Sequence, residues 1–168
     1  MKVIVKRILA LCTVLLLIFA LVACDDTSKD DDNVVILDDH KILYNGVVVV
    51  TGVEASELIP KLGNYTSEDG EACGTDEKDV IYTFSGIEIE THVSGSSEIV
   101  RKIEILNDSQ KTEKGITIGS TRDEVIAAYG KNYTEGTGGS LRYEGDTSAI
   151  EFYFGTSGDV SNIYIKRK

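Results

Sequence analysis

Hydrophobic and polar residues alternate along several stretches in the second half of the chain, which is the pattern of half-buried β-strands. One stretch carries on a single face Ile87, Ile89, Thr91 and Val93. Its other face carries Glu88, Glu90 and His92. In a later stretch, the residues expected to point inward are Ile150, Phe152 and Phe154. Those expected to point outward are Glu151 and Tyr153. Shorter segments of the same kind are 82–84, 103–105, 141–143 and 163–165, and the turn residues between them predict antiparallel hairpins.

Two segments bracketed by glycines have the features of helices. In 119–130, Thr121 and Glu124 have the spacing of a capping box, which satisfies free backbone N–H groups in the first helical turn. Gly130 suits the left-handed position that ends a helix. In 52–63, Pro60 removes a backbone donor and crowds the preceding turn. We therefore expect a regular second helix and a short or kinked first one.

These two segments match each other at an offset of 67 residues, and an Asn-Tyr-Thr sequence follows each. β-Rich segments precede them, at 47–51 and 115–118. The match indicates an internal repeat, with chance similarity as the alternative. The predicted fold is α+β, with two tandem β-α-β-β-β repeats and helices packed on one face of an antiparallel sheet. Repeat 1 is expected at 41–110 and repeat 2 at 111–168.

The N-terminus has a basic start and an apolar run over 8–22, too short for a comfortable membrane span. The run ends Leu21-Val22-Ala23-Cys24, which resembles the lipobox of bacterial lipoproteins. That resemblance implies cleavage after residue 23, a lipid on the Cys24 thiol and a membrane-anchored protein facing outside the cytoplasm. An ordinary secretory signal or an uncleaved anchor is the alternative. The acidic stretch 24–40 is expected to be a solvated tether, although the apolar segment 33–37 within it either pairs at a sheet edge or stays in the tether.

Charge narrows the range of partners. The chain has 17 basic and 28 acidic residues, a net charge of −11. Lys2, Lys6 and Arg7 lie in the leader, so the remainder has 14 basic residues against 28 acidic ones. Nucleic acid and anionic lipid headgroups need a basic patch, and this balance argues against both.

Several motifs together resemble a known superfamily. The segment 119–130 resembles the glycine-bracketed helix of β-lactamase-inhibitor-protein-like repeats, which the small lipoprotein of the outer-membrane β-barrel assembly machine carries once. More narrowly, the chain is similar to uncharacterised lipoproteins of Gram-positive anaerobes, through Cys73 and the segments 82–84, 87–91 and 112–119. The likeness covers about 47–168 and departs at Thr75 and Glu77. It implies helices against one face of an antiparallel sheet, and it assigns no functional residue besides Cys24.

Candidate catalytic groups are few. Cys73 lies in an acidic loop, and acidic neighbours raise a thiol pKa, so an idle thiol is the better interpretation, with a Cys73–His92 pair as the alternative. His40 and His92 have no metal-ligand spacing, and no nucleophile-elbow or phosphate-binding motif is present. The sequence thus predicts no enzyme, no cofactor and no metal.

The polar strand faces carry the functional hypothesis. One predicted unit offers Tyr153 and Tyr164, and exposed tyrosines are typical of recognition surfaces. The other offers Glu88, Glu90, His92 and Glu104, together with Lys102. We expect a non-catalytic module that binds an unidentified protein or ligand of the cell envelope, with a plain solvated surface as the alternative. Three other functions stay open: an inhibitor of a hydrolase, an envelope assembly factor, or an enzyme of unrecognised type.

Overall fold

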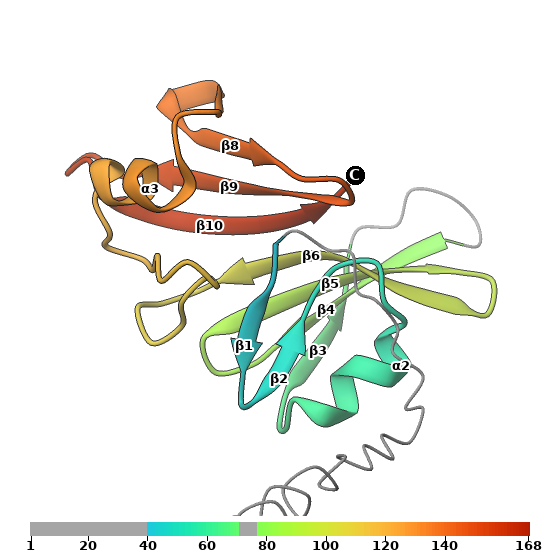
Figure 1. The fold of residues 1–168 in the computed structure, drawn as a ribbon. Coiled ribbons are helices and arrows are strands. Elements are labelled where there is room, and N and C mark those ends of the chain that lie inside the picture. The colour runs from blue at the N-terminus through green and yellow to red at the C-terminus, as the bar shows by residue number, and fades with distance from the viewer. Residues whose placement is uncertain (1–39, 71–76) are drawn as a thin grey trace, which may run out of the picture. The chain divides into compact units, whose positions relative to one another are not determined.

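The computed structural model describes residues 40–70 and 77–168. They form an α+β fold dominated by antiparallel sheet (Figure 1). A two-stranded sheet pairs β1 (Ile42–Tyr44) with β2 (Val47–Val49). The turn between them has positive φ at Asn45 (50°) and Gly46 (82°), as a two-residue hairpin connection requires.

The main sheet has eight strands in the order β3-β4-β5-β6-β10-β9-β8-β7. The first four are β3 (Thr66–Asp69), β4 (Glu77–Thr83), β5 (Ile87–Ser94) and β6 (Ser97–Ile105). The second four are β7 (Thr134–Glu135), β8 (Leu141–Glu144), β9 (Ser148–Phe154) and β10 (Val160–Arg167). Each set is a meander of neighbouring strands. The two sets join where β6 and β10 pair antiparallel, with Ile103 opposite Ile165 (Figure 1).

One side of this sheet, here called the inner face, is apolar because period-two alternation aligns hydrophobic residues across strands. Two rows of register partners cross it. The first row runs through Ile87, Ile105, Ile163, Phe152 and Leu141. The second row runs through Ile89, Ile103, Ile165, Ile150 and Tyr143. All ten are buried, so this face is the centre of the core.

Helical segments and the small hairpin share that core. The helices are α2 (Ala55–Leu58), its 3₁₀ continuation η1 (Ile59–Lys61), α3 (Arg122–Tyr129) and the 3₁₀ turn η2 (Thr137–Gly139). Buried side chains from α2, η1, α3 and the hairpin belong to the same hydrophobic cluster as the inner face: Ile42, Val49, Ala55, Leu58, Ile59 and Val125.

Both helix predictions are confirmed. Thr121 caps α3, Glu124 completes the capping box, and Gly130 follows with a φ of 90°. Pro60 lies inside η1, where the α-helical geometry of α2 has ended after four residues.

Several sequence expectations are corrected. Segment 115–118 is a turn and not a strand, because the Thr112 side chain accepts a hydrogen bond from the Ile116 N–H and Gly115 has a φ of 84°. Residues 47–51 contribute only β2, which lies outside the main sheet. The strands β1, β3 and β7 were not anticipated. His40, assigned to the tether, is buried with Nδ1 3.1 Å from Ser148 Oγ.

Candidate functional site

The side of the main sheet opposite the inner face, here called the outer face, is polar. Strand register places one row of side chains across it, through Thr83, Glu88, Glu104, Tyr164, Glu151 and Arg142. The adjacent row holds Glu90, Lys102 and Lys166. The β6–β10 junction therefore brings the predicted residues of both halves together. Glu104 lies directly opposite Tyr164, although 60 positions separate them in sequence.

Tyr153 and Tyr164 form an aromatic pair on this face. Their ring centroids are 5.5 Å apart with an interplanar angle of 85°, an edge-to-face arrangement that favours attraction between aromatic rings. The ammonium groups of Lys166 and Lys102 lie 5.2 and 5.9 Å from the Tyr164 ring centroid. Burial and the nearby Glu104 raise the pKa of Tyr164, so its hydroxyl is protonated at neutral pH. Both tyrosines are half-buried, which leaves part of each ring accessible.

Glu151 organises the β8–β10 side of the outer face. It points outward as the alternation predicts, yet its neighbours cover it and leave only 7% exposed. Tyr153 donates its hydroxyl hydrogen to Glu151 Oε2 at 3.1 Å, and Lys166 donates to the same oxygen at 2.7 Å. Arg142 donates to Oε1. Burial works against ionisation of Glu151, but these cationic donors outweigh it and lower the pKa. The carboxylate thus fixes the orientation of Tyr153.

The β5–β6 side has the opposite balance of charge. Glu88 lies opposite Glu104, and burial followed by the Glu104 charge raises the pKa of Glu88. Lys102 forms its ion pair with Glu90 at 2.5 Å. Glu104 accepts a hydrogen bond from Asn162 at 3.3 Å. An acidic area therefore adjoins the aromatic pair.

His92 is separated from this centre. It lies further along β5, with Nδ1 2.8 Å from Asp79 Oδ1 and Arg101 close to the same oxygen at 3.4 Å. Of the six residues predicted for binding, the structure groups five around the β6–β10 junction and leaves His92 in its own ion-paired cluster.

Cys24 and Cys73 lie outside the described residues. Among residues 40–70 and 77–168, no group of three or more His, Cys, Asp or Glu side chains is placed to hold a metal ion. In the same ranges, no helix has the length and apolar character that crossing a bilayer requires.

A hollow of about 410 Å³ lies between the end of α3 and the β8–β9 turn, lined in part by His40, Lys114 and Tyr129. The Lys114 ammonium covers the Tyr129 ring at 4.5 Å from its centroid. Glu144, also in the lining, is held by Arg142 and Lys168. These charged groups already contact neighbouring side chains, so the outer face is the better candidate site.

Sequence reasoning did not select Glu151, Arg142 and Lys166. Alternation gives the face of each residue on its own strand, but the network exists only through the β8–β9 and β9–β10 registers. The signal that could have indicated this network is an outward acidic residue on one strand with an outward basic residue on each of the two neighbouring strands.

Comparison with models of protein families, with curated proteins and with solved structures finds no match to this chain.

Proposed function

We propose that this protein is a lipid-anchored, non-catalytic binding module of the cell envelope whose outer face contacts another protein. The observation that carries the proposal is the Tyr153–Tyr164 pair, held by Glu151 and bordered by the Lys102 and Lys166 ammonium groups. Tyrosines contribute large contact area with few rotatable bonds. Side chains already fixed by hydrogen bonds lose little further entropy on binding, and such preorganisation increases affinity.

The proposal includes an origin by duplication. Each half of the main sheet follows a helical segment: α2 with η1 precedes β3–β6, and α3 precedes β7–β10. The strand order reads symmetrically outward from the β6–β10 pair. This arrangement supports two tandem repeats, each a helical segment followed by four strands, with the helices on the inner side. These units replace the β-α-β-β-β units expected from the sequence. The same arrangement supports the proposed kinship with β-lactamase-inhibitor-like repeats. Lipid attachment at Cys24 rests on the lipobox-like sequence alone.

An affinity capture tests the binding role. The full chain, with a C-terminal tag and its own leader, is produced in the source organism and purified in detergent. Tyr153→Ser/Tyr164→Ser is compared with wild type and with Tyr65→Ser, which removes an exposed tyrosine packed against Tyr82 and Phe84 on the inner side. We expect a retained protein that is lost at least about tenfold in the double variant, since aromatic anchors carry more than 1 kcal/mol each. It should persist in the control.

Equal retention by all three chains would reject the outer face as the contact surface. Circular dichroism spectra of the variants establish that they remain folded. If the captured protein is a hydrolase, a titration of its activity with wild-type chain distinguishes a stoichiometric inhibitor from a simple binder.

A further inference from the structure

The two ends of the main sheet differ in how open their edges are. One end is β7, which has only two residues, and the Glu135 carboxylate there pairs with Arg122. The other end is β3, whose four residues Thr66–Asp69 are all exposed. An edge strand presents main-chain N–H and C=O groups with which another strand can pair, and a very short edge limits such pairing. The end at β3 is therefore the more open one.

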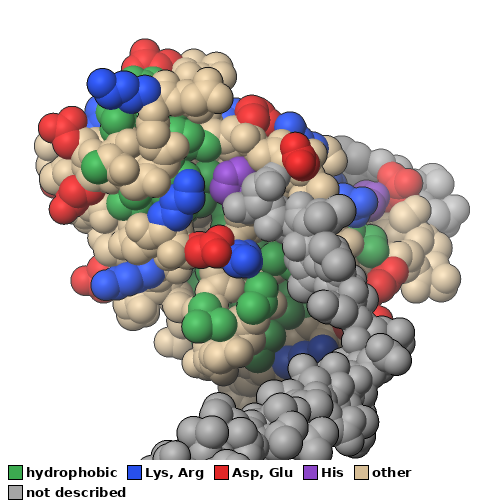
Figure 2. All heavy atoms as spheres, in the orientation of Figure 1, with side chains coloured by type: hydrophobic (Ala, Val, Ile, Leu, Met, Phe, Trp, Pro, Cys, Tyr) green, Lys and Arg blue, Asp and Glu red, His purple; other side chains and the backbone are tan. Residues whose placement is uncertain are grey.

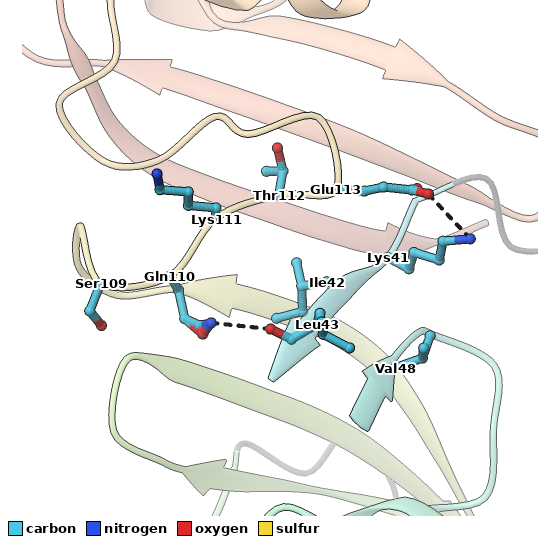
Figure 3. Close-up of a pocket in the computed structure, with 9 residues that line it drawn as sticks. All are labelled: Lys41, Ile42, Leu43, Val48, Ser109, Gln110, Lys111, Thr112 and Glu113. Carbon is cyan, nitrogen blue, oxygen red and sulfur yellow. Dashed lines mark hydrogen bonds and ion pairs between the residues drawn. The ribbon is translucent and has the colours of Figure 1, made fainter. Parts of the chain in front are cut away.

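The small hairpin shows how an edge is closed within this molecule. Gln110 Nε2 donates to the Leu43 carbonyl (Figure 3), and the Glu113 N–H donates to the Lys41 carbonyl, both at 3.3 Å. The segment 109–113 therefore occupies the edge of β1. Hydrophobic side chains lie at the surface over this hairpin (Figure 2), but β1 itself offers no open edge for a further strand.

Strand register identifies the main-chain groups of β3 that are unused. The Gly70 N–H donates to the Asp79 carbonyl at 2.8 Å, so these residues form a hydrogen-bonded pair at the end of the β3–β4 ladder. Such pairs alternate along an antiparallel ladder, so Glu68 also bonds to β4, whereas Ser67 and Asp69 direct their main-chain groups away from it. Within the described ranges, neither residue has a main-chain hydrogen bond to another segment. The open edge thus has two N–H donors and two C=O acceptors.

The side chains beside this edge differ between the two sides of the sheet. Glu68 points to the outer side, and none of the ion pairs among the described residues includes it. On the inner side the small Ser67 lies opposite Tyr82, whose half-buried ring packs 5.3 Å from the exposed Tyr65 ring. An added strand would place alternate side chains beside a carboxylate on one side and beside tyrosine rings on the other.

We infer that β3 receives an extended segment of another protein in which basic residues alternate with apolar ones. Main-chain hydrogen bonds provide affinity in such strand addition, and the alternate side chains provide specificity. Basic side chains would pair with Glu68, because opposite charges on neighbouring strands stabilise a sheet. This contact is separate from the proposed outer-face contact, so cross-links from Tyr65 and Tyr153 would identify different proteins.

A second copy of this chain fits the edge poorly. The antiparallel register that bonds Ser67 of one copy to Asp69 of the other places the two Glu68 carboxylates opposite each other. Like charges in that position destabilise a sheet. The acidic edge therefore disfavours self-pairing and favours a basic partner, since specificity can arise from repulsion of the wrong partner.

Synthetic peptides test the inference on the ¹⁵N-labelled full chain, purified in detergent. The probe is an acetylated peptide of alternating Lys and Val. One control peptide has Glu in place of Lys, and the other is N-methylated at every residue, which removes the N–H donors but keeps the side chains. We expect the Lys–Val peptide to slow amide exchange at Ser67 and Asp69, and to leave Glu68, already bonded to β4, unchanged. In NMR titrations both control peptides should bind about tenfold more weakly.

Matched variants at residue 67 separate strand addition from attraction by charge. Ser67→Pro removes the outward N–H and keeps the β3–β4 bonds, because an edge strand accepts proline where its N–H faces solvent. We expect Ser67→Pro to bind the Lys–Val peptide about tenfold more weakly, and Ser67→Ala to bind it like wild type. Glu68→Lys should reverse the preference between the Lys–Val and Glu–Val peptides.

Three results would overturn the inference. The first is equal binding of the N-methylated and unmodified peptides, which would show attraction by charge alone. The second is unchanged exchange at Ser67 and Asp69 in the presence of the Lys–Val peptide. The third is protection of these two amides that rises with protein concentration without peptide, because a second copy would then be the occupant.

Discussion

Two acidic side chains on the outer face, Glu88 in β5 and Glu151 in β9, have opposite electrostatic surroundings. Glu151 has cationic partners on both neighbouring strands, and its pKa is lowered despite its burial. Glu88 lies opposite a second carboxylate, that of Glu104, and burial followed by this charge raises the pKa of Glu88. Both residues occupy outward positions between inward hydrophobic residues on their strands. The difference arises from the residues that the register places opposite them.

This contrast divides the outer face into a compensated part, in which cations pair with Glu151, and an acidic part, in which Glu88 and Glu104 lie opposite each other. The Glu151 network orients Tyr153, whereas Glu88 and Glu104 leave negative charge beside Tyr164. A partner surface with an aromatic-binding pocket and a nearby cation would complement both parts. Like charges placed directly opposite in a sheet are destabilising, so the acidic part costs stability in the free protein.

The largest expected effect comes from Glu151→Gln. Arg142 and Lys166 would lose the shared charged acceptor, and we expect a loss of about 2 kcal/mol in the free energy of unfolding, measured by urea denaturation at pH 7. Because folding lowers the pKa of Glu151 below its ordinary value of 4.5, its contribution is complete above that value and is lost as the pH falls through the folded-state pKa.

The matched control is Glu144→Gln, an exposed partner of the same Arg142, for which we expect less than about 1 kcal/mol. Equal effects of the two variants would remove the special role of Glu151. A gap between wild type and Glu151→Gln that stays constant down to pH 3 would show that ionisation of Glu151 is not its source.

Adding a cation near Glu88 should give this carboxylate the kind of charged partner that Glu151 already has. Thr83 lies directly opposite Glu88, so Thr83→Lys offers the missing partner. We expect the pKa of Glu88, followed by NMR titration, to fall, with a gain in stability of up to about 1 kcal/mol. Ser67→Lys, on an adjacent strand but the other side of the sheet, should leave that pKa unchanged. An unchanged Glu88 pKa in Thr83→Lys would contradict the electrostatic interpretation.

The smallest effect is expected from Glu88→Gln, which removes one of the two opposed charges. Folding raises the pKa of Glu88 above its ordinary value of 4.5, so ionisation weakens the fold at neutral pH. The variant should be more stable than wild type by about 0.5 kcal/mol at pH 7. This advantage should vanish below the ordinary pKa, where the carboxyl is protonated in both folded and unfolded chains. A destabilised variant at pH 7 would show that Glu88 makes a favourable contact.

Much of the fold is predictable from local patterns. Alternation identifies β5 and β9 and their inward residues, and the capping box identifies α3, because both signals depend on neighbours in sequence. The pairing of β6 with β10 depends on tertiary packing and has no local signal. Segment 115–118 has strand-like composition, but Thr112 and Gly115 fold it into a turn.

The candidate site likewise has features that local sequence patterns predict and features that depend on strand pairing. The polar faces and their tyrosines are visible in sequence, but the meeting of Glu104 with Tyr164 and the coordination of Glu151 are consequences of register. His92 illustrates the converse, because it shares the predicted face but lies with Asp79 instead of the tyrosines.

The central claim is that the outer face around Tyr153 contacts a protein partner in the envelope. A photoreactive phenylalanine derivative at position 153, in the full chain and in intact cells of the source organism, tests this directly. The comparison position is Tyr65, which is 46% exposed on the inner side of the molecule. We predict a cross-linked species of defined mass from position 153 that is absent from position 65. No cross-linked species from position 153, or the same species from both positions, would contradict the claim.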